Sequence, residues 1–359
     1  MKLLATTSMG DKVYKYEKSI VVFFNAERKV LSTSIYNGGY HEDFLGVFNN
    51  DGTQGAGMPC KMLADNYGEH MHVLANKLGL NPEKVTGMVT AASMDNVAIR
   101  SLTYEELTVT AIVTGGIETN GGRVGDPSDY YKPLEKPYKL GTINIILLLD
   151  SDMPAGTLTR ALVTCTEAKT AAIQELMAGS NYSTGIATGS GTDQTIIVAN
   201  TTSELYLEGS GKHSKMGELI GKVVMAAVKE ALEKQTGLCP KFQHDSLQRI
   251  KRFGVDETSI WNKYLTSGGR AIKPEFLIKL TQIAKKDSIV TITSLYVHLL
   301  DQFLWKLLGE EEIVVEANYL LAQMADELQV EAVQVTRVTV SEFNNAWEKL
   351  VISAIKKRC

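Results

Sequence analysis

The hydrophobic pattern of the first 200 residues is that of short strands alternating with helices. Runs rich in β-branched and aromatic residues predict strands, and they span Ser19–Phe24, Lys29–Tyr36, Val85–Ala92, Leu107–Thr114, Gly141–Asp150 and Gln194–Ala199. The largely apolar run at Gly141–Asp150 is typical of a central strand that is buried on both faces.

Three helices are expected among these strands. The first is predicted over Pro59–Leu78, because proline suits a first helical position and Gly79 a stop. The second runs from Pro154 to about Gly179. The third is the clearest, with apolar residues at helical spacing from 216 to 232 and a stop at 237. A stretch rich in Gly, Pro and Asp predicts a loop over Gly115–Lys139.

The pattern changes at Pro240, after which helical periodicity dominates residues 243–328. Val333–Val340 is expected to form a short strand, and Ser341 to cap a last helix. We therefore predict an α+β fold with a mixed, largely antiparallel sheet core flanked by helices over residues 1–239. A mostly α-helical domain of unknown role is expected to follow over 240–359.

Charge and cysteine content narrow the function classes. The 359 residues carry a net charge of −4, and residues 240–359 hold 16 basic and 15 acidic side chains. Neither part has the basic excess that phosphate neutralisation requires, which argues against a nucleic-acid partner. The four cysteines are scattered without metal or disulfide spacing. No signal peptide or membrane span is evident, so a cytoplasmic location without membrane association is expected.

Four segments in order carry the most specific signal, because such a set rarely arises by chance. They are GTINIILLLD (141–150), TEAKTAA (166–172), TGSGTD (188–193) and GKHSKMGELIG (211–221). Looser matches are STSIYNGG (32–39), TAAS (90–93) and TNGGRVGD (119–126). With these motifs the first two-thirds of the chain resembles the adenosylcobinamide amidohydrolase family.

This resemblance implies hydrolysis of adenosylcobinamide to adenosylcobyric acid and aminopropanol, a step of corrinoid salvage. The partner would be a corrinoid small molecule, and no further cofactor is implied because the cobalt belongs to the substrate. A homo-oligomer is left open. The alternatives are a corrinoid-binding or regulatory protein of the same fold that does not turn over its ligand, and a nucleotide-dependent enzyme using the GSGK stretch. That stretch departs from a P-loop, because Tyr206 stands where the motif needs glycine.

The Gly-rich turn at 188–193 is the first candidate site. Gly189, Ser190, Gly191 and Thr192 could aim backbone N–H groups at a substrate amide oxygen or an oxyanion, with Asp193 as an orienting carboxylate. The alternative is a plain loop before a strand. His213 precedes the clearest helix, where a neutral imidazole could move a proton. Its alternative is a surface histidine, and the family resemblance favours the catalytic assignment.

The TEAKTAA motif supplies two further catalytic candidates. Lys169 falls on the apolar stripe formed by Leu158, Leu162, Cys165 and Ala172, so its charge needs a buried partner such as Asp193, or must reach solvent. Glu167 points to the opposite, polar face of the same helix, where its alternative is simple solvation. A regular helix therefore should not bring both charges into one pocket.

Asn37, Asn120 and Arg123 are candidate substrate contacts, because they lie in Gly-rich turns and a corrinoid rim carries many amides. Their alternatives are ordinary turns or a surface loop. No metal site is predicted, since His70 and His72 are two residues apart and diverge on a helix.

Overall fold

The computed structural model describes residues 1–55, 58, 60–128 and 141–357. The chain divides into two compact units. The first comprises Met1–Tyr182 and Ala187–Cys239, and the second comprises Ser183–Ile186 and Pro240–Cys359.

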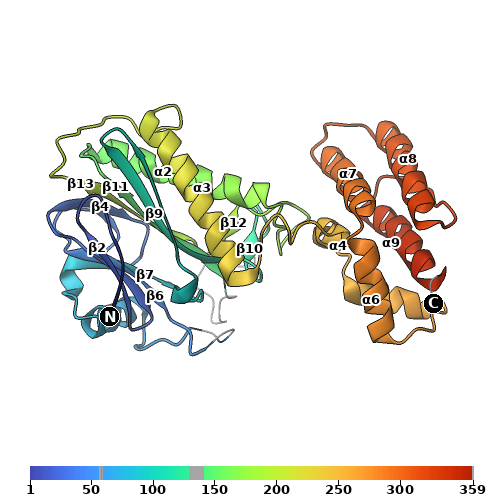
Figure 1. Cartoon of the computed structure of the whole chain (residues 1–359), viewed down its shortest axis with the longest axis horizontal. Helices are drawn as coiled ribbons and strands as arrows, with labels where there is room; N and C mark the ends of the chain where they lie inside the picture. Colours follow the sequence, from blue (N-terminus) through green and yellow to red (C-terminus); the bar gives the residue numbers. More distant parts are fainter. Residues whose placement is uncertain (56–57, 59, 129–140, 358–359) are drawn as a thin grey trace. The chain divides into compact units, whose positions relative to one another are not determined.

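The first unit contains two principal β-sheets (Figure 1). One has the strand order β1 (Lys2–Thr6), β2 (Lys12–Tyr16), β3 (Ser19–Phe23), β6 (Gly46–Asp51), β7 (Val85–Thr90). The other has the order β5 (Gly39–His41), β4 (Arg28–Ser32), β13 (Gln194–Asn200), β11 (Thr142–Leu149), β9 (Leu107–Gly116), β8 (Ala98–Tyr104). The pairs β6–β7 and β11–β13 are parallel, and the other pairs of these two sheets are antiparallel. The predicted α+β class with a mixed, largely antiparallel core is therefore confirmed.

Alternating side chains place the second sheet between two apolar layers. On β11, Ile143 and Ile145 face helices α2 (Ala155–Glu175) and α3 (Lys215–Thr236), whereas Ile146 and Leu148 face the first sheet. Helix α1 (Tyr67–Lys77) packs on the outer face of the first sheet. The order of layers is thus helix, sheet, sheet, helices. This explains the apolar character of β11, because both of its faces are buried.

The caps of α3 agree with the sequence. Ser214 precedes the helix and its side chain accepts the N–H of Gly217, while Gly237 ends it in the left-handed conformation at φ 74°. Short elements complete the unit: the 3₁₀ turns η1 (Pro82–Lys84) and η2 (Met94–Asn96), and the paired strands β10 (Gly121–Gly122) and β12 (Gly189–Ser190).

Several predicted boundaries were wrong. Helix α1 begins at Tyr67 behind the N-cap Asn66, and residues 60–66 are not helical; Pro59 itself lies outside the described residues. The strand expected to reach Tyr36 ends at Ser32, because the following serine and asparagine side chains bind backbone groups and form a turn. The expected loop over 115–139 contains the end of β9 and strand β10, and its residues 129–139 lie outside the described part.

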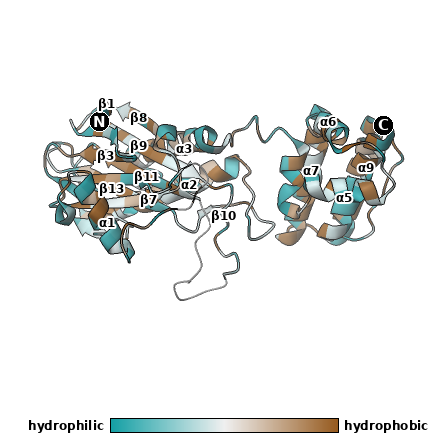
Figure 2. Cartoon of the chain, turned by 90° about the horizontal axis from the view of Figure 1, so that it is seen from below, coloured by the Kyte–Doolittle hydropathy of each residue, from teal (hydrophilic) through white to brown (hydrophobic). Residues whose placement is uncertain are grey.

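The second unit is helical, as predicted. Its elements are α4 (Ser246–Ile250), η3 (Lys251–Phe253), α5 (Glu257–Thr266), α6 (Lys273–Ala284), α7 (Asp287–Leu304), α8 (Glu310–Leu328) and α9 (Val340–Lys357). Their inward faces form one hydrophobic core, and hydrophobic residues are brown in Figure 2. Across the described residues of the whole chain, no helix is long and apolar enough to span a membrane.

The strand predicted at Val333–Val340 is wrong. Residues 331–339 pack without a strand, and the side chain of Asn318 bonds both the N–H and the carbonyl of Val335. Ser341 is not the cap of the last helix either. Helix α9 starts one residue earlier, and the hydroxyl of Thr339 accepts the N–H of Glu342 at 3.1 Å.

Candidate functional site

Three of the four sequence motifs converge on the carboxylate of Asp193. Its Oδ1 accepts the N–H of Ile143 at 2.8 Å and the hydroxyl of Ser190 at 2.7 Å. Its Oδ2 accepts the N–H of Ser190 at 3.0 Å and forms an ion pair with Lys169. Strand β11, helix α2 and the 188–193 turn are therefore joined at one point. We call this arrangement the Asp193 clamp, comprising Ile143, Lys169, Ser190 and Asp193.

The clamp confirms the prediction that Lys169 has a buried partner. The side chains of Lys169 and Asp193 are only 12% and 11% exposed. Cys165 lies one turn earlier on the same buried face of α2, and burial raises the pKa of its thiol to about 12. In such surroundings an unpaired ammonium would be costly, and the carboxylate offsets that cost.

Glycine is required at one of the two glycine positions of the turn. A Cβ on Gly189 would lie 2.3 Å from Oδ2 of Asp193 and 2.6 Å from Nζ of Lys169, so it would occupy the space of the ion pair. A Cβ on Gly191 would meet nothing within 4 Å. The absence of a side chain at Gly189 is thus what allows the two charged groups to meet.

Of the turn's backbone N–H groups, that of Ser190 points at an anion, whereas the expected nest of several N–H groups is not seen among its described residues. That anion is the carboxylate of Asp193 itself, and the N–H of Thr192 binds the Ser190 hydroxyl at 3.2 Å. In this geometry the Ser190 amide is already used within the turn. Thr192 is exposed, and its hydroxyl donates to the carbonyl of Gly141.

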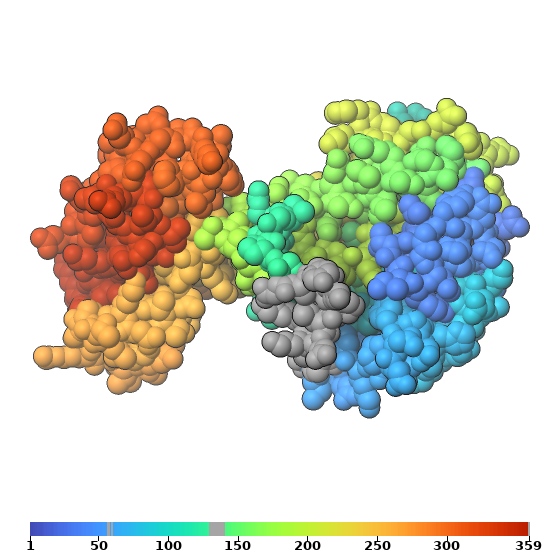
Figure 3. Space-filling view, turned by 180° about the vertical axis from the view of Figure 1, so that it is seen from behind, coloured from blue at the N-terminus to red at the C-terminus, as the bar shows by residue number. Residues whose placement is uncertain are grey.

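The loop at 120–126 lies beside the turn, where the candidate substrate contacts were expected. Strand β10 pairs with β12, so that Gly121 is opposite Ser190. The side chain of Asn120 is committed, since it donates to Gly141 and accepts from the Tyr182 hydroxyl. Figure 3 shows the loop, in green-cyan, at the surface of its unit.

Arg123 is the least committed residue of this loop. Its backbone N–H binds Asp126, whose carboxylate also accepts the hydroxyl of Ser180 at 2.6 Å. Among the described residues, none pairs with the guanidinium of Arg123, although the residue is half-buried. A cationic, five-donor group is thereby presented next to the turn.

A row of polar side chains continues from the clamp into the layer between the sheets. Thr114, Asn144 and Gln194 occupy directly paired positions on β9, β11 and β13. Asn49 of the opposite sheet donates to Thr114 at 2.8 Å and accepts from Asn144 at 2.8 Å. Asn49 and Asn144 thus satisfy each other in an otherwise apolar layer, whereas Oε1 of Gln194 is buried without a hydrogen-bond partner among the described residues.

Thr142 links this row to the turn. Its hydroxyl lies 2.7 Å from the carbonyl oxygen of Thr192 and 3.3 Å from Oδ1 of Asn144. Sequence reasoning missed the row, because each of its members belongs to a different strand. The available signal was Asn144, which interrupts an apolar strand that is buried on both faces.

His213 lies far from the clamp, so the expected constellation with Asp193 is not formed. The ammonium of Lys215, at the start of α3, lies 4.4 Å from the centre of the Tyr104 ring, at the β8–β9 turn. At the other end of the helix, Gln235 lies beside Gly116, which pairs with Thr142 next to the 188–193 turn.

Helix α3 separates the two ends by its own length. Its 22 residues rise about 33 Å at 1.5 Å each. His213 is exposed before its first turn, whereas Asp193 lies near its end. The expectation that Asp193 orients His213 is wrong, because no hydrogen bond or ion pair joins the two among the described residues and both oxygens of the carboxylate already have other donors.

Glu167 and Asn37 also lie outside the clamp. Glu167 pairs with Lys212 at 3.2 Å on the exposed face of α2, opposite Lys169, as the helical period predicted. Asn37 adopts φ 47° and its amide donates to the carbonyls of Pro82 and Val85, both at 2.8 Å. These bonds hold the turn that follows β4.

The described residues contain no group of three or more His, Cys, Asp or Glu side chains that could hold a metal ion. The charged groups of the candidate site are Asp193 and Lys169.

Comparison with known proteins identifies a family for the first two-thirds of the chain. A family model described as adenosylcobinamide amidohydrolase matches residues 4–240. An uncharacterized protein of Methanocaldococcus jannaschii is 35% identical over 238 residues, which is 63% of this chain and 89% of that protein. Every residue of the Asp193 clamp falls within the matched range.

Proposed function

Because this chain belongs to the adenosylcobinamide amidohydrolase family, we propose that it hydrolyses the aminopropanol amide of adenosylcobinamide. Water adds across the C–N bond: its oxygen joins the acyl carbon, the bond to nitrogen breaks, and the amine gains a proton. The products are adenosylcobyric acid and aminopropanol, as corrinoid salvage in the cytoplasm requires. The corrinoid and its cobalt enter as substrate.

The observation that carries this proposal is the convergence of three family motifs on one carboxylate. When the C–N bond of an amide breaks, the amine leaves readily only if its nitrogen is protonated. A hydrolase therefore needs one group that accepts a proton from the attacking water and one that donates a proton to the amine nitrogen. Asp193 accepts a hydrogen bond from the Ser190 hydroxyl at 2.7 Å, which supports a role for this carboxylate as the proton acceptor. The ammonium of Lys169 is the paired donor.

Substrate contacts are proposed at the rim of the clamp. The guanidinium of Arg123 can donate to the oxygens of the peripheral amides of a corrinoid, and the Thr192 hydroxyl, whose proton goes to Gly141, can accept from their N–H groups. The amides of Asn120 and Asn37 are committed to the protein itself. We therefore assign these two asparagines to holding the loops.

The reaction is tested by incubating the full chain with adenosylcobinamide and identifying the product by mass. We expect gain of a carboxylic acid and loss of aminopropanol. Asp193→Asn should lower kcat by about a hundredfold or more, which is the usual contribution of a proton-transfer group. Glu167→Gln is the matched control, because it changes a carboxylate of another of the four motifs that lies outside the clamp, on the exposed face of α2.

His213→Ala decides between this proposal and a proton shuttle at the start of α3. We expect turnover near that of the wild type, since the imidazole lies at the other end of that helix from the clamp. A hundredfold lower turnover in a correctly folded His213→Ala variant would show that His213 takes part in catalysis.

A corrinoid-binding protein without turnover is the second candidate. It is favoured by the commitment of both Asp193 oxygens to donors within the protein. Saturable binding of adenosylcobinamide, with intact substrate recovered after prolonged incubation, would select it.

A further inference from the structure

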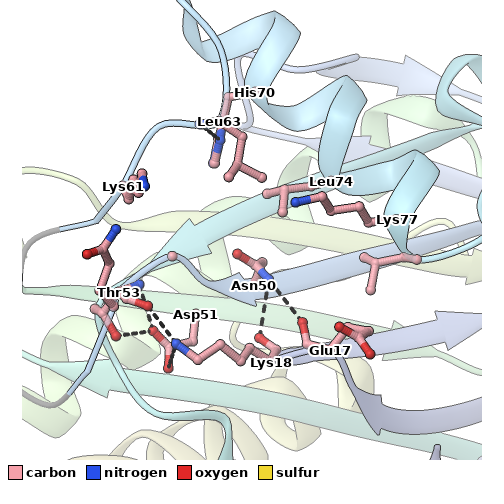
Figure 4. A pocket seen from close by; sticks show the side chains of 13 residues that line it. Glu17, Lys18, Asn50, Asp51, Thr53, Lys61, Leu63, His70, Leu74 and Lys77 are labelled. Carbon is pink, nitrogen blue, oxygen red and sulfur yellow. Dashed lines mark hydrogen bonds and ion pairs between the residues drawn. The ribbon is translucent and has the colours of Figure 1, made fainter.

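A second polar pocket lies on the outer side of the first sheet, beneath α1. Its volume is about 230 Å³, and Figure 4 shows the side chains that line it. The pocket is bounded by the β2–β3 turn, the end of β6 and the segment that leads into α1. Neighbouring residues of β6 serve the two sides of the sheet: Asn49 faces the layer between the sheets, and Asn50 lines this pocket.

One acid and one base of the pocket neutralise each other. Oδ1 of Asp51 accepts the N–H and the hydroxyl of Thr53, at 2.9 and 2.6 Å. Its Oδ2 lies 3.9 Å from Nζ of Lys18, which donates to the carbonyl of Thr53. These bonds hold the loop after β6, and they leave the pocket without a net charge from this pair.

Two further ammonium groups have no such partner. Lys61 and Lys77 line the pocket from different segments (Figure 4), and no carboxylate of the described residues pairs with either. Glu17 is the remaining acid among the described lining residues, and it is exposed to solvent. The pocket therefore has an excess of positive charge, and its two cations are unneutralised at short range.

The buried end of the pocket adds neutral groups. His70 is 2% exposed, and its Nδ1 accepts the N–H of Leu63 at 3.0 Å, so a neutral ring carries its proton on Nε2. Burial lowers the pKa of this imidazole, and Lys77 lowers it further. Asn50 is 4% exposed: its amide nitrogen donates to Ser19, whereas its Oδ1 has no partner among the described residues.

We propose that this pocket binds a phosphate group, either free or on a small phosphate monoester. The ammonium groups of Lys61 and Lys77 and the Nε2–H of His70 supply charge-assisted and neutral donors for its oxygens. Oδ1 of Asn50 is an acceptor for a P–OH proton or a ligand hydroxyl. This site is independent of the proposed amide hydrolysis, from which it is separated by the first sheet.

Titration of the full chain with inorganic phosphate tests the proposal. Isothermal titration calorimetry should show saturable binding at one site, and the melting temperature should rise with phosphate concentration. The double variant Lys61→Gln, Lys77→Gln should bind at least about tenfold more weakly, because two charge-assisted hydrogen bonds are removed. Both lysines are exposed, so the fold should tolerate the change.

Lys12→Gln is the matched control, since it removes an exposed lysine of the same sheet that does not line the pocket. It should bind phosphate like the wild type. Parallel titrations with glycerol 3-phosphate and with sodium chloride at equal ionic strength identify the source of the effect. Tighter binding of the ester points to a metabolite, and tighter binding of inorganic phosphate to the free ion. Equal binding by the double variant, an equal response to chloride, or no saturation with either phosphate would overturn the proposal.

Discussion

Lys169 occupies a position where the repeat of α2 asks for a hydrophobic residue, and the structure shows why a charge is tolerated. The ammonium meets Asp193, and that carboxylate has three further donors from Ser190 and Ile143. Gly189 leaves the space in which they meet. At this scale a few atoms decide whether two motifs distant in sequence can form one site.

Lys169→Met should destabilise the first unit, because it leaves the buried carboxylate of Asp193 without its ion-pair partner. Breaking a buried pair costs roughly 3–5 kcal/mol, and slight access to water places this case at the lower end. Chemical denaturation followed by circular dichroism measures the loss. Lys222→Met is the control: its pair with Glu218 is exposed to solvent, so its loss should destabilise the unit much less. Unchanged stability and turnover in Lys169→Met would show that the ion pair contributes neither.

Gly189→Ala should disrupt the clamp more than its size suggests. The added methyl group would overlap Oδ2 of Asp193 and Nζ of Lys169, and overpacking of this kind costs about 1–3 kcal/mol. We expect reduced turnover together with a lower melting temperature. Gly191→Ala, two residues away and with open space around its Cβ, should change stability by less than about 0.5 kcal/mol. Equal effects of the two substitutions would contradict the assigned role of Gly189.

At the scale of elements, helix ends depend on which side chain reaches the first free N–H groups. Ser214 caps α3, and Gly217 in its first turn has no room for a side chain, since a Cβ would lie 2.0 Å from the Gly211 carbonyl oxygen. Part of the GKHSKMGELIG motif around His213 is therefore explained by the cap and the close backbone packing at the start of α3. The end of the same helix, not its start, lies near the clamp.

The start of α9 gives a direct test of cap assignment. Thr339→Ala removes the hydroxyl that accepts the N–H of Glu342, and loss of such a cap costs about 1 kcal/mol. Ser341→Ala, inside the first turn of the helix, should be neutral or slightly stabilising because alanine favours helices. Tryptophan fluorescence during urea unfolding compares the two. A larger loss in Ser341→Ala would restore the sequence-based cap.

At the scale of the whole molecule, each unit has a hydrophobic core of its own. The three tryptophans, Trp261, Trp305 and Trp347, all belong to the second unit, so their fluorescence reports on that unit alone. Cys165 is completely buried in the first. The two units can therefore be followed separately in one sample.

A chain ending at Cys239 should fold without the helical unit and retain the clamp. Cys165 should then resist alkylation until denaturant is added, because burial excludes the reagent and raises the pKa of its thiol to about 12. Exposed Cys60 is the internal control. Mass spectrometry of the labelled peptides checks both sites. Modification of Cys165 as fast as Cys60 in native buffer would show that this unit needs the rest of the chain.

The sequence by itself determined the class of fold, the main strands and helices, and the family. These follow from local patterns: period-two and period-3.6 hydrophobicity, Ser214 and Gly237 at the ends of a helix, and four motifs in order. It also indicated that Lys169 must either pair with a buried acid or reach solvent, because a charge on an apolar helix face must be compensated.

Only the tertiary structure decided which motifs meet. Strand register placed Asn144 beside Gln194 and opposite Asn49, and the direction of α3 carried His213 away from Asp193. The outer pocket likewise draws Lys61 and Lys77 from different segments. Spacing along the chain could not reveal these relations, because strand pairing and helix packing, rather than local periodicity, set the distances between residues that are remote in sequence.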